Sequence, residues 1–277
     1  MGLNGMKAAA RQGPAKAGKD VAARRADQVR RLMAAIHPIP VEVGAIRPLS
    51  FEEAEERDRE RRERGEDEIH CETRDGVRSQ VKTKLGHWFR EPHDTEAVVR
   101  RLRDLARRNA QHAAAIYYRV ALNADGSHPG LVLIDDADRE AVDELKSEGL
   151  EPCAVIETSP GNFQCLIRFD DRMDPTRARL LGGWLNQKFG DPAATNASQP
   201  GRLPGFTNGK PQHRKPDGKS PFVGLVETDP GRVASQGSEW IDKILNDVAQ
   251  GGAAVPKDRF RTPRRKREAA LARTGAG

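Results

Sequence analysis

Two adjacent aspartates are the residues of this 277-residue chain whose types and spacing point most directly to chemistry. Asp135 and Asp136 directly follow the apolar run at 131–134, which is typical of a buried strand. Like charges at the end of a buried strand cost free energy unless a positive group lies near them. A divalent ion such as Mg²⁺ is the usual partner, because it takes one or two carboxylates together with substrate phosphates.

The backbone sets a condition on this pair. Side chains alternate along a strand, so Asp135 and Asp136 share a site only if the chain already turns at Asp136. Otherwise Asp136 and Asp138 are the pair on one face. The alternative without a metal is that Asp136 or Asp138 caps the helix expected at 138–148, while Asp135 is solvated. A phosphoreceiver domain is not supported, because no later strand ends in a phosphoacceptor aspartate followed by a lysine.

A long loop at 190–216 gathers cations among turn-forming Pro and Gly residues. Its charged or titratable residues include Asp191, Arg202, Lys210, His213, Arg214 and Lys215. Such a loop suits a triphosphate or the phosphates of a nucleic acid strand. The alternative is an exposed flexible loop without a ligand.

The charge of the chain is concentrated at its ends. The net charge is +6, yet residues 1–35 and 255–277 each carry eight Lys or Arg and two acids, so the middle is acidic. Basic tails commonly contact nucleic acid phosphates without reading sequence, and the alternative is that they are solvated and disordered. No secretory signal or membrane-length apolar run is present, and the three cysteines are scattered, so we expect a cytoplasmic protein with reduced thiols and no structural zinc.

Periodicity and turn signals predict the α+β class, with a mainly antiparallel or mixed sheet and helices packed on one face. We expect a basic, largely disordered extension at 1–49, a charged helical spacer at 50–90, a compact domain at 91–250 and a basic tail at 251–277. In the spacer, Ser50 and Glu53 form a capping box ahead of a segment with ten acids and five arginines at 52–68.

The segment at 152–169 predicts a hairpin that turns on residues 159–162. With that turn, Thr158 faces Phe163 and Glu157 faces Gln164. Glu157 and Gln164 then lie on the face that mixes apolar and polar side chains, which lines a cleft, while the other face packs against helices.

Four segments occur in an order and at a spacing that resemble a known family. They are GLVLIDD, LKSEGLEPCAVIETSPGNFQCLIRF, GDPAA and GRLPGFTNGK, and together they cover roughly residues 100–230. This series is similar to the RepB-type DNA primase domain family of mobilisable plasmids and integrative elements. In plasmid primases of this type an Arg-His pair precedes GRL, whereas this chain has Ser198 and Gln199 there.

The resemblance implies a compact primase-like catalytic domain that makes short primers on single-stranded DNA by metal-dependent nucleotidyl transfer, in plasmid or mobile-element replication or transfer. It implies Mg²⁺ or Mn²⁺, nucleoside triphosphates, and a relaxase or replicative helicase as partner, with no membrane. The implied catalytic and metal-binding residues are Asp135, Asp136 and Asp191. The implied nucleotide-binding residues are Arg202, Asn208 and Lys210. The implied DNA-binding residues are Tyr118, Arg119, Phe163, Gln164, His213, Arg214 and Lys215, with Phe206 as a further stacking candidate.

Two other classes of function stay open. A non-catalytic DNA-binding accessory protein of a plasmid or conjugative element would account for the basic tails and the missing histidine. The third class is a structural adaptor that acts through the acidic segment at 50–68, and only that segment supports it.

Overall fold

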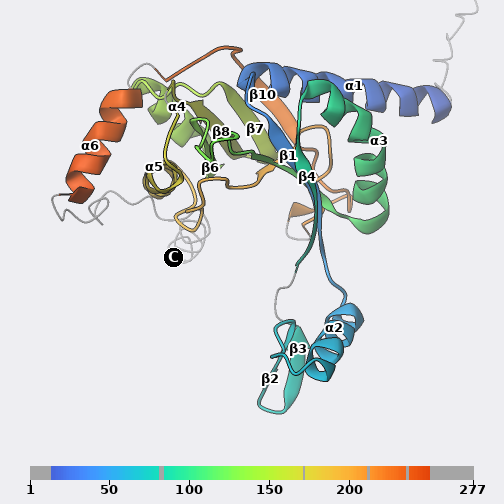
Figure 1. The fold of residues 1–277 in the computed structure, drawn as a ribbon. Coiled ribbons are helices and arrows are strands. Elements are labelled where there is room, and N and C mark those ends of the chain that lie inside the picture. The colour runs from blue at the N-terminus through green and yellow to red at the C-terminus, as the bar shows by residue number, and fades with distance from the viewer. Residues whose placement is uncertain (1–13, 81–83, 171, 211–212, 235–236, 250–277) are drawn as a thin grey trace, which may run out of the picture.

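The computed structural model describes residues 14–80, 84–170, 172–210, 213–234 and 237–249 (Figure 1). The helices are α1 (Pro14–Ile36), α2 (Phe51–Glu63), α3 (Thr95–His112), α4 (Arg139–Ser147), α5 (Pro175–Phe189) and α6 (Gly237–Ala249). The strands are β1 (Val41–Pro48), β2 (Cys71–Arg74), β3 (Val77–Gln80), β4 (Lys84–His93), β5 (Ala115–Val120), β6 (Leu131–Ala137), β7 (Ala154–Ser159), β8 (Asn162–Arg168), β9 (Gly201–Arg202) and β10 (Gly224–Thr228). None of the described helices is long and apolar enough to span a membrane.

Short polar side chains begin the helices where the sequence places them. Asp94 accepts a hydrogen bond from the backbone N–H of Ala97 at the start of α3. Asp174 does the same for the first turn of α5, where Pro175 follows as the first helical residue. Asp138 caps α4 by accepting from Ala141 at 2.8 Å. Asp138 therefore serves the helix and leaves Asp135 and Asp136 as the pair of interest.

Two four-stranded sheets form the body of the protein, which confirms the α+β class. One has the order β4-β1-β5-β9 and the other the order β10-β7-β8-β6, and every pair among the described strands is antiparallel. One core cluster lies between α1, α3 and both sheets, and a second lies between the other face of the β6–β8 sheet and α4, α5 and α6. The two sheets thus share one core, with β5 and β9 near β6 and β8.

The N-terminal part of the chain differs from the expected disordered extension. Residues 14–48 form α1 and β1, and β1 pairs with β4 on one side and β5 on the other. Val41, Val43 and Ala45 are buried, and so are Val29 and Leu32 of α1. The alternation of small apolar residues in VEVGAI is the strand signal in this segment. The outer part of the expected extension, residues 1–13, and the expected tail from 251 lie outside the described residues.

The β7–β8 hairpin turns where the sequence predicts, but its register is one residue different. Ser159 pairs with Asn162 and Glu157 pairs with Phe163, with a bulge at Thr158. The expected Thr158–Phe163 and Glu157–Gln164 pairs are therefore wrong. The extra residue in β7 moves Gln164 onto the face that carries Ile156, toward the core shared by the two sheets.

A small module projects from the ends of β1 and β4, and we call it the arm (residues 49–80; Figure 1). Its helix α2 begins with the predicted Ser50–Glu53 capping box and packs on the β2–β3 hairpin. Asp58 is fully buried and accepts hydrogen bonds from the backbone N–H groups of Ile69, His70 and Cys71. Burial raises the pKa of Asp58, but these donors outweigh it and the pKa is lowered.

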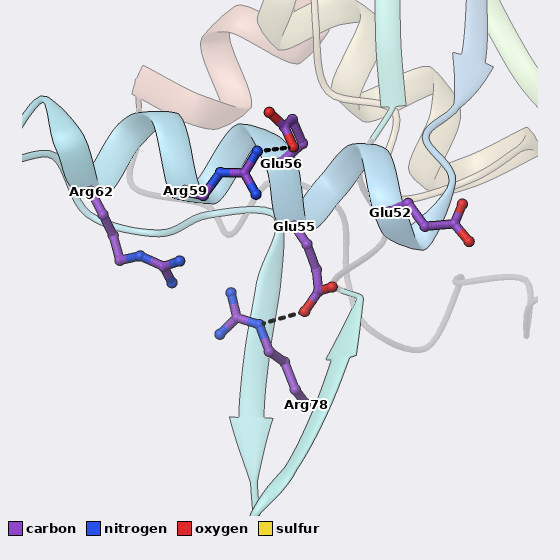
Figure 2. A pocket seen from close by; sticks show the side chains of 6 residues that line it. All are labelled: Glu52, Glu55, Glu56, Arg59, Arg62 and Arg78. Atoms are coloured by element: carbon purple, nitrogen blue, oxygen red, sulfur yellow. Dashed lines mark hydrogen bonds and ion pairs between the residues drawn. The ribbon is translucent and has the colours of Figure 1, made fainter.

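The arm contains a shallow pocket, and its charges are paired. Figure 2 shows that Glu55 of α2 faces Arg78 of β3 and that Arg59 is bonded to Glu56. Arg62 is bonded to Glu68, which also pairs with Arg78. Since these carboxylates and guanidinium groups satisfy one another, the pocket carries no chemistry of its own and we place the candidate site elsewhere.

Candidate functional site

The chain turns at Asp136, as a shared carboxylate site requires. Asp136 has a φ of +57°, in the left-handed region, and the pairing of β6 with β8 skips from Ile134 to Ala137. The backbone N–H of Asp136 donates to Oδ1 of Asp135 at 3.0 Å. Asn and Asp adopt this conformation more readily than most residues, so an aspartate here meets both the charge and the backbone requirement.

The Asp135 carboxylate is mostly buried and is held by a neighbouring strand. Nε2 of Gln164 on β8 donates to its Oδ1 at 2.8 Å. Burial raises the pKa of Asp135, and the negative charge of Asp136 raises it further. The hydrogen bond from Gln164 and the positive charge of Lys210 lower the pKa, but the net shift is upward. A carboxylate with a raised pKa in partly desolvated surroundings favours a cation as partner.

Gln164 also joins the two sheets. Its side chain is 2% exposed, and its Oε1 accepts from the backbone N–H of Arg202 on β9 at 2.8 Å. One amide thus fixes the Asp135 carboxylate at the end of β6 and the backbone of Arg202 in the other sheet. The amide nitrogen and the amide oxygen of Gln164 each make a hydrogen bond within the protein, and these two bonds determine which way the amide points.

The Arg202 guanidinium lies in this region with part of its donors unused. Arg202 is 4% exposed, and its Nη2 has no hydrogen-bond partner among the described residues. The guanidinium carbon lies 5.1 Å from the centre of the Tyr117 ring. Burial lowers the pKa of Arg202, and Tyr117 and Asp135 raise it. A buried guanidinium with a free donor is suited to a negatively charged ligand.

The third aspartate is brought to Asp135 through the backbone. Asp191 donates its backbone N–H to the carbonyl oxygen of Asp135 at 2.8 Å. Asn186 of α5 accepts from the Asp135 N–H at 2.8 Å and donates to the carbonyl of Leu133. At Gly190 an added Cβ would lie 2.3 Å from the Asp135 carbonyl oxygen, so only glycine permits this approach. The end of α5 is therefore fitted directly onto the end of β6.

The described residues include no group of three or more His, Cys, Asp or Glu side chains placed to hold a metal ion. The side chain of Asp191 accepts from the N–H of Ala193 at 3.0 Å. The donor chemistry fits a hard cation such as Mg²⁺ or Mn²⁺ that is held by one or two carboxylates and completed by substrate phosphates and water.

The remaining nucleotide-binding candidates differ in their surroundings. Asn208 is 1% exposed, and its side chain donates to the carbonyl of Thr158 and accepts from the N–H of Lys210. Asn208 therefore holds the loop in place, and its amide is engaged within the protein. Lys210 is exposed and acts electrostatically on Asp135. Arg214 and Lys215 are exposed, and His213 is partly buried.

All three of the expected stacking aromatics are in the core. Tyr118, Phe163 and Phe206 are 2%, 5% and 1% exposed. Their rings are packed among core side chains, so we do not include them among the DNA contacts proposed below. Arg119 is bonded to Glu42 of the adjacent strand β1 at 2.5 Å.

Sequence reasoning missed two residues that shape the site. Tyr117 lies opposite Arg202 in the β5–β9 pair and supplies the ring beneath its guanidinium. The alternation of AIYYRV contains this information, since Ile116, Tyr118 and Val120 are buried and Tyr117 is on the other face. Asn186 had no local signal, because its role depends on α5 packing against β6.

Comparison with known proteins places these features in a family. The model of the RepB DNA-primase N-terminal domain matches residues 92–250. A DNA primase from Acidithiobacillus ferrooxidans is 39% identical over 101 residues, which are 35% of this chain and 29% of that protein. Mobilization protein A from Escherichia coli is 33% identical over 156 residues, 56% of this chain and 21% of that protein. The chain thus spans less than a third of the length of either relative.

Solved structures show the same fold. The crystal structure of primase RepB′ has a TM-score of 0.60 at 22% identity, covering 91% of this chain and 68% of that chain. The catalytic domain of primase RepB′ in complex with initiator DNA has a TM-score of 0.59 at 24% identity, covering 82% of this chain and 97% of that chain. The family match covers more than half of the sequence, and the chain belongs to the RepB DNA-primase N-terminal domain family.

Proposed function

We propose that the protein is a metal-dependent DNA primase that makes short primers on single-stranded DNA from nucleoside triphosphates. The observation that carries the proposal is the Gln164 bridge, which sets the mostly buried Asp135 carboxylate beside the buried Arg202 with its unused donor. A site that holds a carboxylate for a cation and a guanidinium for an anion suits a triphosphate with its bound metal. The family match and the primase folds support this proposal.

Asp135 and Asp136 are the proposed ligands of Mg²⁺ or Mn²⁺, with Asp191 as a third carboxylate at the same backbone junction. The metal, when bound, would activate the primer 3′-hydroxyl and stabilise the pyrophosphate leaving group. Gln164 keeps the Asp135 carboxylate in place, and Asn186 keeps its backbone in place. This support reduces the reorganisation that the carboxylate needs during the reaction.

The cations of the site would bind the triphosphate. Arg202 would direct its unused Nη2 donor to a phosphate oxygen, with Tyr117 restricting the position of its guanidinium. Lys210 lies close enough to affect the pKa of Asp135 and would meet the same negative charge from the loop side. Ser198 and Gln199 stand where related plasmid primases have an Arg-His pair, so Arg202 would carry a larger share of the phosphate contacts here.

Incorporation of labelled nucleotides on single-stranded DNA with Mg²⁺ or Mn²⁺ tests the proposal. The double variant Asp135→Asn with Asp136→Asn removes both charges, and Asn tolerates the positive φ at 136. We expect synthesis to fall at least about a hundredfold, as for loss of central catalytic charges. Asp143→Asn on the exposed face of α4 is the matched control and should be unchanged. Full synthesis by the double variant would show that the mechanism is wrong.

The second candidate is a non-catalytic DNA-binding accessory protein of a mobile element. The observation that favours it is that no three carboxylate, His or Cys side chains converge in the described part of the chain. It predicts DNA binding that is the same in the wild type and the Asp135/Asp136 double variant, with no incorporation by either. Incorporation that depends on Asp135 excludes it. A relaxase or replicative helicase is a proposed partner for both candidates, and the likeness to a mobilization protein supports that setting.

A further inference from the structure

The outer face of α3 carries a line of arginines outside the site described above. Arg100, Arg103 and Arg107 follow one another at helical spacings of three and four residues, and all three are exposed. This spacing places them on one side of the helix over about 10 Å of its length. Arg100 and Arg103 form no ion pair with any described residue, while Arg107 is bonded to Asp104 at 2.8 Å.

The acids near this line are already engaged. Glu96, on the same face of α3, lies 3.6 Å from Arg30 of α1. Asp104 binds both Arg107 and Arg108. The face therefore presents uncompensated positive charge, which favours a polyanion over a neutral or basic partner.

The end of α3 is joined to a second basic segment by a buried asparagine. Asn109 is 7% exposed, accepts from the N–H and the hydroxyl of Thr207, and donates to the Thr207 carbonyl. Thr207 in turn pairs with Phe222 in an isolated antiparallel bridge. Asn109 thus fixes the end of α3 to Thr207, and the bridge from Thr207 to Phe222 closes the loop that carries Arg214, Lys215 and Lys219.

Phe222 is an unusual residue at this junction because it is 45% exposed. Its neighbours Pro221 and Val223 are buried and hold its backbone, since Pro221 accepts from the N–H of Asn208 and Val223 donates to the carbonyl of Phe206. An exposed aromatic ring on a held backbone, next to a loop that carries cations, is suited to stack on a nucleic acid base. From this junction the loop leads to Lys210, which acts on Asp135.

We propose that Arg100 and Arg103 of α3, the loop cations Arg214 and Lys215, and Phe222 form a binding track for the single-stranded template outside the reaction centre. This inference rests on the proposed function and gives the template a path toward Asp135. The charge of the arginine line suits the successive phosphates of a nucleic acid strand. The ring of Phe222 takes a base without reading its identity.

Fluorescence anisotropy with a labelled thymidine oligonucleotide of about 16 nucleotides, the upper end of usual site sizes, tests the track. Arg100→Ala with Arg103→Ala should weaken binding about tenfold and reduce the slope of log affinity against log salt by about 0.7 for each phosphate that the variant no longer neutralises. The matched control is Arg57→Ala with Arg74→Ala, which removes the same charge from the surface of the arm. Unchanged affinity and slope in the α3 variant would overturn the proposal.

Phe222 separates stacking from simple charge. Phe222→Ala should weaken binding about tenfold without changing the salt slope, and Phe222→Trp should restore it, because stacking needs a ring and carries no charge. Equal affinity of the Ala and wild-type proteins would remove Phe222 from the track.

Nucleotide incorporation distinguishes failure of the track from failure of the proposed function. The α3 double variant should keep the wild-type kcat, which is reached at saturating template. Its KM for template should be about tenfold higher than that of the wild type. If the wild type makes no primer but the α3 variant still binds the oligonucleotide more weakly, the primase proposal fails and the track stands. If primer synthesis is normal and the α3 variant has the wild-type KM for template, the track fails and the primase proposal stands.

Discussion

Gln164 donates to the carboxylate of Asp135 at 2.8 Å while its other amide atom accepts from the backbone of Arg202 at 2.8 Å. These two bonds join a sheet that supplies the acid to a sheet that supplies the cation. Because the amide has donors at one end and an acceptor at the other, no carboxylate or aliphatic side chain can make both bonds. Gln164 is therefore a positioning residue in the proposed reaction.

The first prediction concerns this bridge. Gln164→Met keeps the volume but removes both hydrogen bonds, and we expect a loss of about 10- to 100-fold in kcat, as for supports of metal ligands. The variant should also need a higher Mg²⁺ or Mn²⁺ concentration for half-maximal synthesis, which a general loss of stability would not produce. Synthesis rates across a metal titration, with unfolding monitored in parallel, measure both effects. A normal metal requirement would contradict the positioning role.

The second prediction concerns the contact between α5 and β6. Gly190→Ala places a Cβ 2.3 Å from the carbonyl oxygen of Asp135, so the helix end must move and we expect a loss of about 1–3 kcal/mol of stability with loss of synthesis. Gly183→Ala in the same helix meets nothing within 4 Å and should stabilise by about 0.5–1 kcal/mol with normal activity. Chemical denaturation of the two variants measures the contrast. Equal effects of the two substitutions would show that the close approach is not important.

The third prediction concerns the unused donor of Arg202. Arg202→Met should raise the KM for nucleotide about 10- to 100-fold, as expected for loss of a charge-assisted hydrogen bond. Its unfolding midpoint should be equal to or higher than that of the wild type, since a buried guanidinium without full pairing costs free energy. Arg139→Met is the control, because Arg139 is exposed and paired with Glu227. A lower midpoint with an unchanged KM would assign Arg202 a purely structural role.

The fourth prediction concerns the pH dependence of the arm. The hydrogen bond from Arg47, with that from the Ser50 backbone, lowers the pKa of Glu53 from 4.5 to about 2. A folded-state pKa below the unfolded value means that the stabilisation is present above pH 4.5 and is lost as the pH falls toward 2. The protection of α2 amides against hydrogen exchange, taken relative to the intrinsic exchange rate at each pH, should therefore fall in this range.

Glu53→Gln provides the control for the arm. Its α2 amides should exchange faster than those of the wild type at neutral pH, and the difference should vanish toward pH 2. Amides of β7 and β8 in the body serve as the internal reference. A constant difference at every pH would show that the Arg47–Glu53 pair does not stabilise the arm.

Local signals in the sequence account for much of the secondary structure. Asp94, Asp138 and Asp174 cap helices as short acceptor side chains ahead of apolar periodic segments should. Strand alternation alone also required a turn at Asp136 if Asp135 and Asp136 were to share a site. The φ of +57° at Asp136 shows that the chain turns there. These features depend on neighbours within a few residues, which is the range over which sequence patterns are informative.

The features that sequence reasoning missed depend on long-range contacts or on single inserted residues. The bulge at Thr158 shifts the hairpin register by one and turns Gln164 toward Asp135, and nothing in ETSPGN distinguishes a bulged hairpin from a regular one. We expected Tyr118 rather than Tyr117 at the site, because the two neighbouring tyrosines differ only in the face of β5 on which they lie. The place of β1 depends on pairing with residues that are 36 or more positions away in the sequence.

The arm has a further consequence for how the chain can be divided. Pro48 pairs with Lys84, and Arg47 pairs with Leu85, so the arm leaves and re-enters the body at adjacent points of one antiparallel pair. Replacing residues 49–83 with a short turn would close β1 and β4 into an ordinary hairpin and leave the candidate site intact. A fragment that begins at the family boundary near residue 92 would instead remove β1 and expose the edge of β5, which would promote pairing between copies and aggregation. The folded body that carries the candidate site is therefore discontinuous in sequence, and the separable part is the arm inserted within it.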